Sequence, residues 1–197
     1  MTTYTYPEIR PSTQAWRLDG NTAIHRSPMN NSISTMDRDG EAWSIRMSYA
    51  DIEGSRRRLL AAFLFKLNGA QHRMAIRDFG YVRAGVGGGT PLVNGADQTG
   101  KNLVIDGAPN STNGWLLAGD KIGVAGLLHS VDADVDTDGS GNATIIVSPR
   151  IFIPPNTNDA VEIDAPTNSF ALNIPFIEVV TQPPIISSLG FSAVSAL

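Results

Sequence analysis

The chain has 197 residues, 42% of them apolar, and its 15 Lys or Arg and 19 Asp or Glu give a formal net charge of −4. It contains no cysteine, which excludes disulfides, thiolate metal sites and cysteine nucleophiles. The apolar fraction is sufficient for a buried core, and the 19 Gly and 12 Pro favour strands and turns over a helical bundle. No stretch is strongly basic, so we do not expect nucleic acid to be a specific partner.

The N-terminal residues show no targeting signal. A basic start followed by an apolar core is absent from the first 16 residues, so no secretory signal is predicted. No apolar run approaches the roughly 20 residues that a membrane-crossing helix needs. We therefore expect a protein that is made in the cytoplasm and has no membrane partner.

Residues 1–49 are predicted to contain short strands. Two lie near 16–18 and 32–36, and Asp39-Gly40 is a good hairpin-turn signal. The next segment, 41–49, alternates apolar and polar residues, with Trp43 on the apolar face. This alternation predicts a half-buried strand.

Residues 49–67 form the one convincing helix of the sequence. Ser48 followed by Asp51 gives a capping-box pattern, and Asn68-Gly69 marks the end. The predicted buried face consists of Ile52, Leu59, Leu60, Phe63, Leu64 and Leu67. Arg56, Arg57 and Arg58 are either a solvated outer face or part of a subunit contact.

The rest of the chain is predicted to be β-rich. Strands are expected at 72–82, 101–107, 142–153 and 169–180, with two more between 113 and 131 joined at Gly119-Asp120. The glycine-rich segment 84–100 lacks the lysine of a P-loop and the helix of a dinucleotide fold, so it is predicted to be a long loop. Because strands and helices do not alternate, we expect a mainly β fold, an antiparallel barrel or sandwich with one helix.

Four aspartates occupy alternate positions in "VDADVDTDGSGNATIIVSPRI", residues 131–151. Counted from Asp134, the spacing matches the first half of an EF-hand loop, but the twelfth position is Ile145, which cannot bind calcium. The flanking segments also read as strands instead of helices. The preferred interpretation is a hairpin with an exposed acidic stripe that resists edge-to-edge aggregation.

No catalytic constellation is recognisable. The histidines at 25, 72 and 129 lack metal-ligand spacing, no G-x-S-x-G elbow occurs, and no pair of carboxylates stands out. We therefore expect no enzyme activity, no metal and no cofactor.

The last segment, 153–197, is rich in proline and apolar residues. We divide the chain into a barrel-like domain with one helix, 1–152, and a C-terminal strand and arm, 153–197. Within this C-terminal segment, residues 181–197 are predicted to form an extended arm whose deletion weakens oligomerisation but leaves the monomer folded. The candidate oligomer contacts are Arg56, Arg57, Arg58, Ile185, Ile186, Leu189 and Phe191.

A more specific pattern lies in "LLAGDKIGVAGLLHSVDADVDTDGSGNATIIVSPRI", residues 116–151. Its Gly-Asp turn, Gly-x-Leu-His corner and Asp-Gly-x-Gly turn resemble a hairpin cassette of the tail proteins of long-tailed bacteriophages. The segments 93–107 and 27–80 resemble the regions that precede the cassette in those proteins. The resemblance covers roughly residues 14–152, and the C-terminal segment departs from it.

The resemblance implies a distal-tail-protein-like structural protein with a tail-tube-like fold. Proteins of this kind form a six-membered ring in the virion, at the tail tip, that joins the tail tube protein to the baseplate hub proteins. Ring formation implies head-to-tail contacts between copies. Within the same class, a tail tube or tail terminator subunit is an alternative.

An alternative from another class is a carbohydrate-binding β-sandwich used in host adsorption. Trp16, Trp43 and Trp115 are its candidate stacking residues. Trp115 is the best of them, because it follows Asn113-Gly114 at a loop edge, whereas Trp43 alternates with polar residues as a core residue does.

Overall fold

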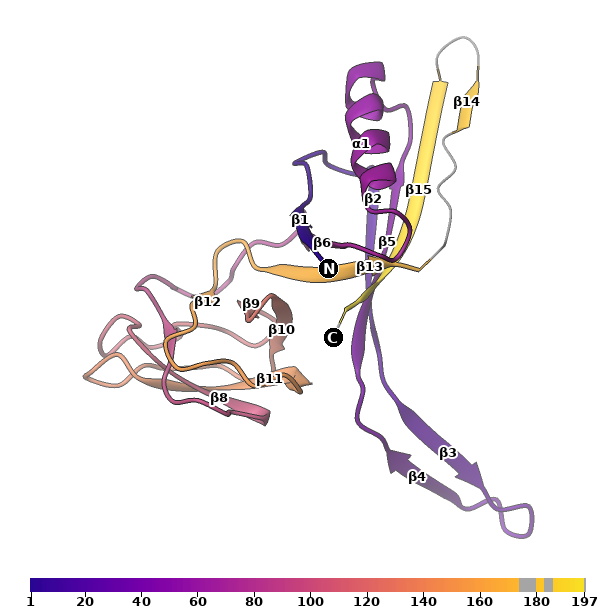
Figure 1. The fold of residues 1–197 in the computed structure, drawn as a ribbon. Coiled ribbons are helices and arrows are strands. Elements are labelled where there is room, and N and C mark those ends of the chain that lie inside the picture. The colour runs from indigo at the N-terminus through magenta and orange to yellow at the C-terminus, as the bar shows by residue number, and fades with distance from the viewer. Residues whose placement is uncertain (174–179, 183–185, 197) are drawn as a thin grey trace.

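The computed structural model describes residues 1–173, 180–182 and 186–196. The described chain forms two lobes, each built on its own β-sheet, and a long hairpin that projects from one of them (Figure 1). The fold is mainly β and antiparallel with one α-helix among the described residues, which confirms the predicted fold class.

The first lobe, here called the sheet lobe, combines the two ends of the chain. Its strands are β1 (Thr3–Thr5), β2 (Thr13–Asp19), β5 (Ala42–Tyr49), β6 (Arg73–Arg77), β13 (Thr167–Leu172), β14 (Val180–Gln182) and β15 (Ile186–Ser195). They run in the order β1-β6-β13-β15-β5-β2, and β14 pairs with β15. The sheet is open, because β2 and β1 lie at its two edges.

Helix α1 (Gly54–Lys66) packs against one face of this sheet. Its buried residues Leu60 and Leu64 join strand residues such as Met47 and Phe170 in one core. On β2, β5 and β15 the alternate residues, among them Ala15, Ser44 and Ser192, point to the other face, where they line an open hollow. The sheet lobe thus has one buried face and one open face.

The second lobe, here called the barrel lobe, is inserted between β6 and β13. Its strands are β7 (Leu92–Val93), β8 (Gly100–Asp106), β9 (Lys121–Val124), β10 (Leu127–Val131), β11 (Ala143–Ile151) and β12 (Val161–Glu162). The order is β12-β9-β10-β11-β8-β7, and the pairing of Leu92 with Ala160 brings the two ends of that order together. The sheet therefore closes into a nearly complete barrel around a separate apolar core.

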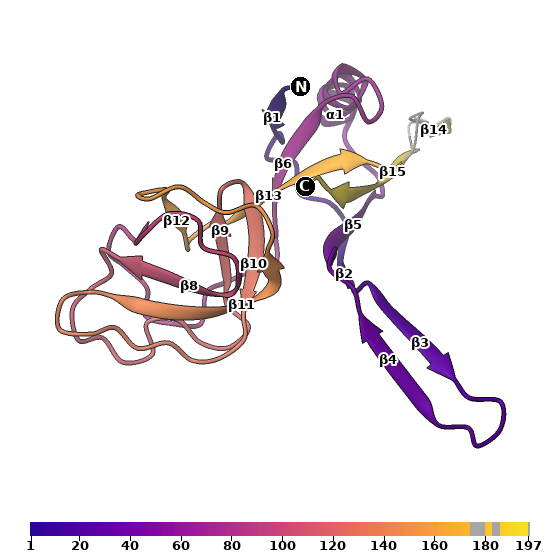
Figure 2. The ribbon, with the colours of Figure 1, turned by 60° about the horizontal axis from the view of Figure 1, so that its bottom comes forward.

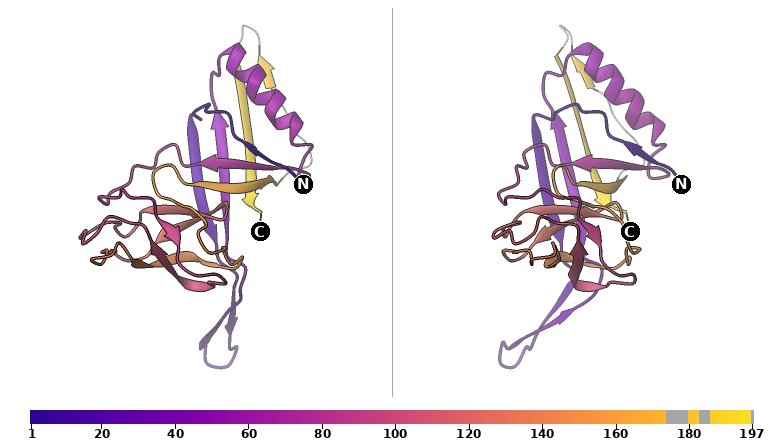
Figure 3. Two further views of the ribbon diagram at one scale, coloured as in Figure 1. Left: turned by 60° about the vertical axis from the view of Figure 1, so that its left-hand side comes forward. Right: turned by 90° about the vertical axis from the view of Figure 1, so that its left-hand side faces the viewer.

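A hairpin of β3 (Thr22–Arg26) and β4 (Ile33–Asp37) continues outward from β2 and β5. Figures 1, 2 and 3 show its tip extending beyond both lobes. The reversal of the chain lies at 27–32, where the Ser27 amide donates to the Ser32 carbonyl over 2.9 Å. The prediction of a hairpin turn at Asp39-Gly40 is wrong: these residues lie where the pairing of β2 with β5 gives way to that of β3 with β4.

The helix is shorter than predicted. Residues 42–49 belong to β5, Asp51 has a positive φ of 51°, and the N-cap is Glu53 without a side-chain cap. Ser48 pairs in the sheet instead of capping the helix, since sheet pairing overrides the local capping signal. Leu59, predicted to be buried, is 59% exposed.

β15, which makes up most of the predicted arm 181–197, is a paired strand of the sheet lobe instead of an extended arm. β15 lies between β13 and β5, and its Leu189, Phe191 and Ala193 are in the core of the sheet lobe. The division at 152/153 likewise does not follow the structure, because β1, β2, β5 and β6 share one sheet with β13 and β15. Strands from the two ends of the chain pair in one sheet, β15 with β5 among them, which a reading along the sequence does not reveal.

Replacing Phe191 tests this placement. Phe191 is 4% exposed and Ser192 beside it lies on the open face of the sheet. We expect Phe191→Ala to lower the free energy of unfolding by about 3–5 kcal/mol, from lost burial and a cavity, and Ser192→Ala to change it by less than about 0.5 kcal/mol. Urea unfolding of dilute protein, followed by circular dichroism, measures both. Equal midpoints for the two variants would contradict the central position of β15.

Candidate functional site: the lobe junction and its outward surfaces

A buried aspartate organises the segment through which the chain crosses from the sheet lobe to the barrel lobe. Asp120 is 2% exposed and its carboxylate accepts hydrogen bonds from the amides of Ala84 (2.8 Å), Gly85 (3.0 Å) and Leu117 (2.9 Å). The Tyr81 hydroxyl donates to the same carboxylate over 3.3 Å. These donors replace the water that a buried carboxylate loses. Asp120 therefore holds residues 81–85, here called the strap, against the barrel lobe.

The next residue, Lys121, ties the barrel lobe to the sheet lobe. Its ammonium group forms an ion pair with Asp78 and lies 4.8 Å from the centre of the Trp16 ring. The Lys121 amide also donates to the Tyr81 hydroxyl over 3.0 Å. Because Asp78 and Lys121 are both mostly buried, solvent screens this pair less than an exposed one.

A second set of polar contacts joins β10 to the sheet lobe. The Trp43 indole N–H donates to the Leu128 carbonyl (2.8 Å), and the Leu128 amide donates to the Asn168 side-chain oxygen (2.9 Å). Asn168 is fully buried and its amide group donates to the Ser195 hydroxyl over 3.2 Å. Hydrogen-bonded and ion-paired groups therefore join the two lobes both near the strap and at β10.

Arg150, near the end of β11, fixes the root of the projecting hairpin. Its guanidinium forms ion pairs with Asp37, at 2.7 Å, and with Asp39. Arg150 itself is three-quarters buried, so both carboxylates are held at a defined place on the barrel lobe. The hairpin consequently leaves the junction in a fixed direction although its outer part touches neither lobe.

The apolar residues of the hairpin are exposed. Ile24 is 70% exposed, Met29 94%, Ile33 58% and Met36 62%. Ile24 and Ile33 fall on one face of the hairpin and Met36 on the other, since directly paired residues share a face. This surface was not predicted, because short strands in a β-rich sequence are expected to pair within a larger sheet. The sequence does contain a signal for it, because apolar residues fall on both faces of a segment whose other residues are too polar for a core.

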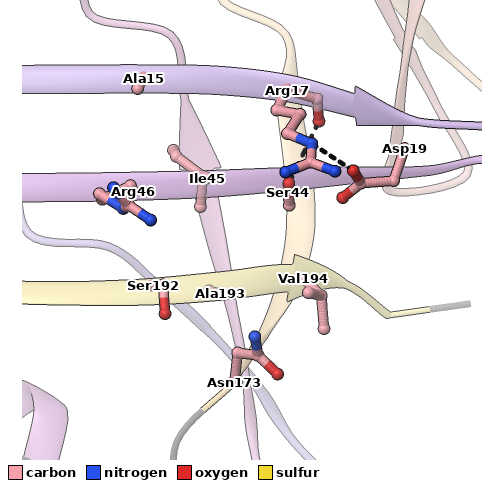
Figure 4. A pocket seen from close by; sticks show the side chains of 10 residues that line it. All are labelled: Ala15, Arg17, Asp19, Ser44, Ile45, Arg46, Asn173, Ser192, Ala193 and Val194. Carbon is pink, nitrogen blue, oxygen red and sulfur yellow. Dashed lines mark hydrogen bonds and ion pairs between the residues drawn. The ribbon is translucent and has the colours of Figure 1, made fainter.

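The open face of the sheet lobe holds a shallow hollow of about 420 Å³ (Figure 4). Ala15, Ser44 and Ser192 form its floor from three adjacent strands, and Arg17 and Arg46 stand at its sides. Arg17 is paired with Asp19 on the same strand. Among the described residues that line it, the hollow brings together no nucleophile with a base and no pair of isolated carboxylates.

The four aspartates of 131–138 accept hydrogen bonds from different neighbouring groups, and their carboxylates do not gather at one point. Asp134 accepts from the Ala118 amide (2.9 Å), Asp136 from the Gly114 amide (2.7 Å), and Asp132 from the Ser148 hydroxyl (2.7 Å). The aspartates that match half of a calcium loop thus serve as acceptors for neighbouring loops. The predicted regular hairpin is also inexact, since β10 ends at Val131 and β11 begins at Ala143.

The turn itself depends on Asp138. Its carboxylate accepts from the amides of Ser140 and Asn142, each at 2.8 Å, and from the Asn142 side chain. These donors, the Asn142 side chain foremost, hold the pKa of Asp138 below its ordinary value. Asp138 is therefore charged and exposed while serving as an acceptor for the backbone of the turn.

The described histidines lie on separate elements. His25 is exposed on the hairpin, His72 precedes β6, and His129 is buried in β10 with its Nδ1 2.7 Å from the Pro149 carbonyl. No three His, Asp or Glu side chains of the described residues gather as a metal site. Burial lowers the pKa of His129, and the hydrogen bond to Pro149 only partly offsets this.

The best predicted sugar-stacking residue is in the interior. Trp115 has no exposed surface, and its indole N–H donates to the Gly88 carbonyl over 3.2 Å. Trp16 and Trp43 are half-buried and pack edge to face with ring centres 5.9 Å apart. Trp115 therefore cannot stack on a carbohydrate, and that prediction is wrong.

The predicted oligomer contacts divide into three groups. Arg56 and Arg58 are exposed on α1, and Arg57 is half-buried there. Leu189 and Phe191 are core residues of this chain, which corrects their assignment to a partner. Ile185 lies outside the described residues, and Ile186 is described only by its backbone pairing with Gln182.

Comparison with known proteins adds no relative to these observations. A scan against models of protein families finds no match, and a search of curated proteins finds none either. Of the described residues, no helix is both long and apolar enough to cross a membrane. Inference about function consequently depends on the surfaces described above.

Replacing Asp120 tests the strap. Asp120→Asn keeps the shape but turns one acceptor into a donor that faces a backbone amide, so we expect a loss of about 2–4 kcal/mol in unfolding free energy. Asp134→Asn, at an exposed aspartate that accepts one amide, should cost less than about 1 kcal/mol. Hydrogen exchange should accelerate at Ala84, Gly85 and Leu117 in the first variant only. Unchanged protection of these amides would contradict the role of Asp120.

His129 should make the protein less stable in acid. Its pKa is lowered on folding, so the unfolded chain binds more protons and stability falls as the pH drops below about 6.5, the unfolded value, toward the folded pKa. We expect His129→Gln to flatten the dependence of unfolding free energy on pH between about 7.5 and 5. His25→Gln, on the exposed hairpin, should leave the dependence unchanged. Urea titrations across this range check both, and equal slopes for wild type and His129→Gln would refute the assignment.

Proposed function

We propose that this chain is a structural subunit of a bacteriophage tail tip, which assembles with copies of itself into a ring joining the tail tube to the baseplate hub. The sequence resemblance supplies the setting and the number of six subunits. The β-rich fold with one helix and the exposed apolar hairpin support the assembly role. Neighbouring tail tube and hub proteins are the further partners that this role requires.

The contrast between the two lobes indicates where self-association occurs. A nearly closed barrel has little free edge, so the barrel lobe presents few unpaired backbone groups. The sheet lobe is open, and within the described part of the chain its edge strand β2 (Thr13–Asp19) pairs on one side only. An incoming strand can extend such an edge.

The projecting hairpin is the single observation that carries the proposal. An isolated two-stranded hairpin is marginally stable in water, and this one exposes apolar side chains on both faces. Burying one such side chain stabilises an interface by about 1.5–3 kcal/mol. Its fixed root at Arg150 means that little orientation is lost on binding, so the hairpin is suited to reach a neighbouring subunit.

Removing the hairpin should abolish assembly without unfolding the lobes. In one variant Asn-Gly replaces residues 23–36, so that the paired Thr22 and Asp37 close a two-residue turn. In a matched variant the hairpin is kept but carries Ile24→Thr, Ile33→Thr and Met36→Thr. We expect wild type to form a closed oligomer and both variants to be monomeric with a thermal midpoint within a few degrees of the wild-type value.

Light scattering after gel filtration measures the mass, and negative-stain microscopy shows whether a ring forms. Stacking of the rings into long tubes would favour the tail-tube alternative over a tail-tip ring. A wild-type monomer at all accessible concentrations would overturn the proposed function. A wild-type oligomer that persists in both variants would exclude the hairpin as its contact.

A further inference from the structure

The outer face of α1 combines apolar and basic side chains. Arg58, Ala62 and Phe65 follow one another at four- and three-residue spacing, and Leu59 lies one turn before Ala62. Leu59 is 59% and Phe65 60% exposed, while the opposite side of the helix contacts the sheet. A helix that is apolar on both sides is normally covered on both. These four residues are here called the helix patch.

The outer wall of the barrel lobe carries a patch that likewise combines apolar and charged side chains. Val104 on β8 and Ile146 on β11 are diagonal neighbours across the two strands, 38% and 42% exposed. Asp106 points to the same face as Val104. Asp132 lies beside β11, where its amide donates to the Ile146 carbonyl (2.8 Å) and its carboxylate accepts from Ser148. Val104, Asp106, Asp132 and Ile146 are here called the wall patch.

The charges of the two patches are opposite, and so are those of the lobes. Residues 90–166 contain three Lys or Arg and ten Asp or Glu, a net charge of −7, so the rest of the chain carries +3. On α1, Arg57 and Lys66 add positive charge near the helix patch, while Arg56 is paired with Glu53. Arg150, on the wall side, is already paired with Asp37 and Asp39. The wall patch is thus acidic and the helix patch basic.

The patches cannot meet within one chain. Figures 1 and 3 show α1 at one end of the molecule and β8 and β11 on the far side of the barrel lobe. Two different surfaces of one chain that fit each other produce a head-to-tail contact, which closes into a ring or continues as a filament. Arg150, which pairs with the root of the hairpin, lies on the same strand as Ile146, so one neighbour can engage both.

We propose that the helix patch of one subunit docks on the wall patch of a second copy of this chain. Leu59 and Phe65 cover Val104 and Ile146, and Arg58 faces Asp132. This inference rests on the proposed self-assembly and names the surfaces that carry it. The opposite lobe charges also bring the copies together in this orientation.

Charge exchange tests the pairing. Arg58→Glu and Asp132→Lys, made singly, should each weaken self-association by roughly tenfold or more, because each places like charges in the contact. The double variant should regain most of the wild-type affinity. An equal mixture of the two single variants should also assemble with alternating subunits. In that assembly the altered helix patch of one variant meets the altered wall patch of the other, and the next contact is the natural pair.

The readouts are the oligomer mass as a function of protein concentration and its dependence on salt. Arg10→Glu, an exposed charge reversal outside both patches, is the control and should leave association unchanged. If the single variants associate as wild type does, or if neither the double variant nor the mixture recovers, the pairing is wrong while the proposed ring stands. A wild-type monomer would overturn both.

Discussion

The carboxylate of Asp120 is the interaction on which the two-lobed arrangement depends. The chain leaves the sheet lobe after β6 and returns at β13, its neighbour in the sheet, so the barrel lobe is attached through two adjacent crossings. Flexible crossings would allow the barrel lobe to swing. Asp120 removes that freedom at the outgoing crossing by accepting the amides of Ala84, Gly85 and Leu117, and the ion pair of Lys121 with Asp78 adds a second restraint. Because these groups are buried and mutually satisfied, rearranging them would leave several of them without a partner at once.

A fixed junction holds the outward surfaces of the two lobes at constant positions relative to one another. The hairpin is held by Arg150 of the barrel lobe although it grows from strands of the sheet lobe, so its direction is a property of both lobes together. Complementary surfaces on opposite ends of one body produce a closed ring only if the body holds a constant angle between them. The polar junction therefore bears on the proposed assembly, because rigidity within the subunit sets the curvature of the assembly.

The aspartate-rich stretch illustrates how one residue type serves two purposes. Asp134 and Asp136 each accept a backbone amide from the loop 114–118, which needs those acceptors because it lies outside the regular strands. The same carboxylates remain exposed and contribute to the negative charge of the barrel lobe. A pattern that reads as half a calcium loop is explained by local backbone requirements and by surface charge, without a cation.

The sequence by itself determined the β-rich class, the helix near 54–66 and several strands, because those depend on local alternation, propensity and glycine placement. It also indicated a half-buried strand at 41–49, where Ile45 and Met47 lie in the core. Only the tertiary structure decided that β15 is central in the first sheet, that Trp115 is interior, and that the apolar residues of the hairpin are exposed. Each of these outcomes depends on which distant segments pair, and an apolar residue such as Phe191 reads the same along the chain whether its cover comes from its own sheet or from another subunit.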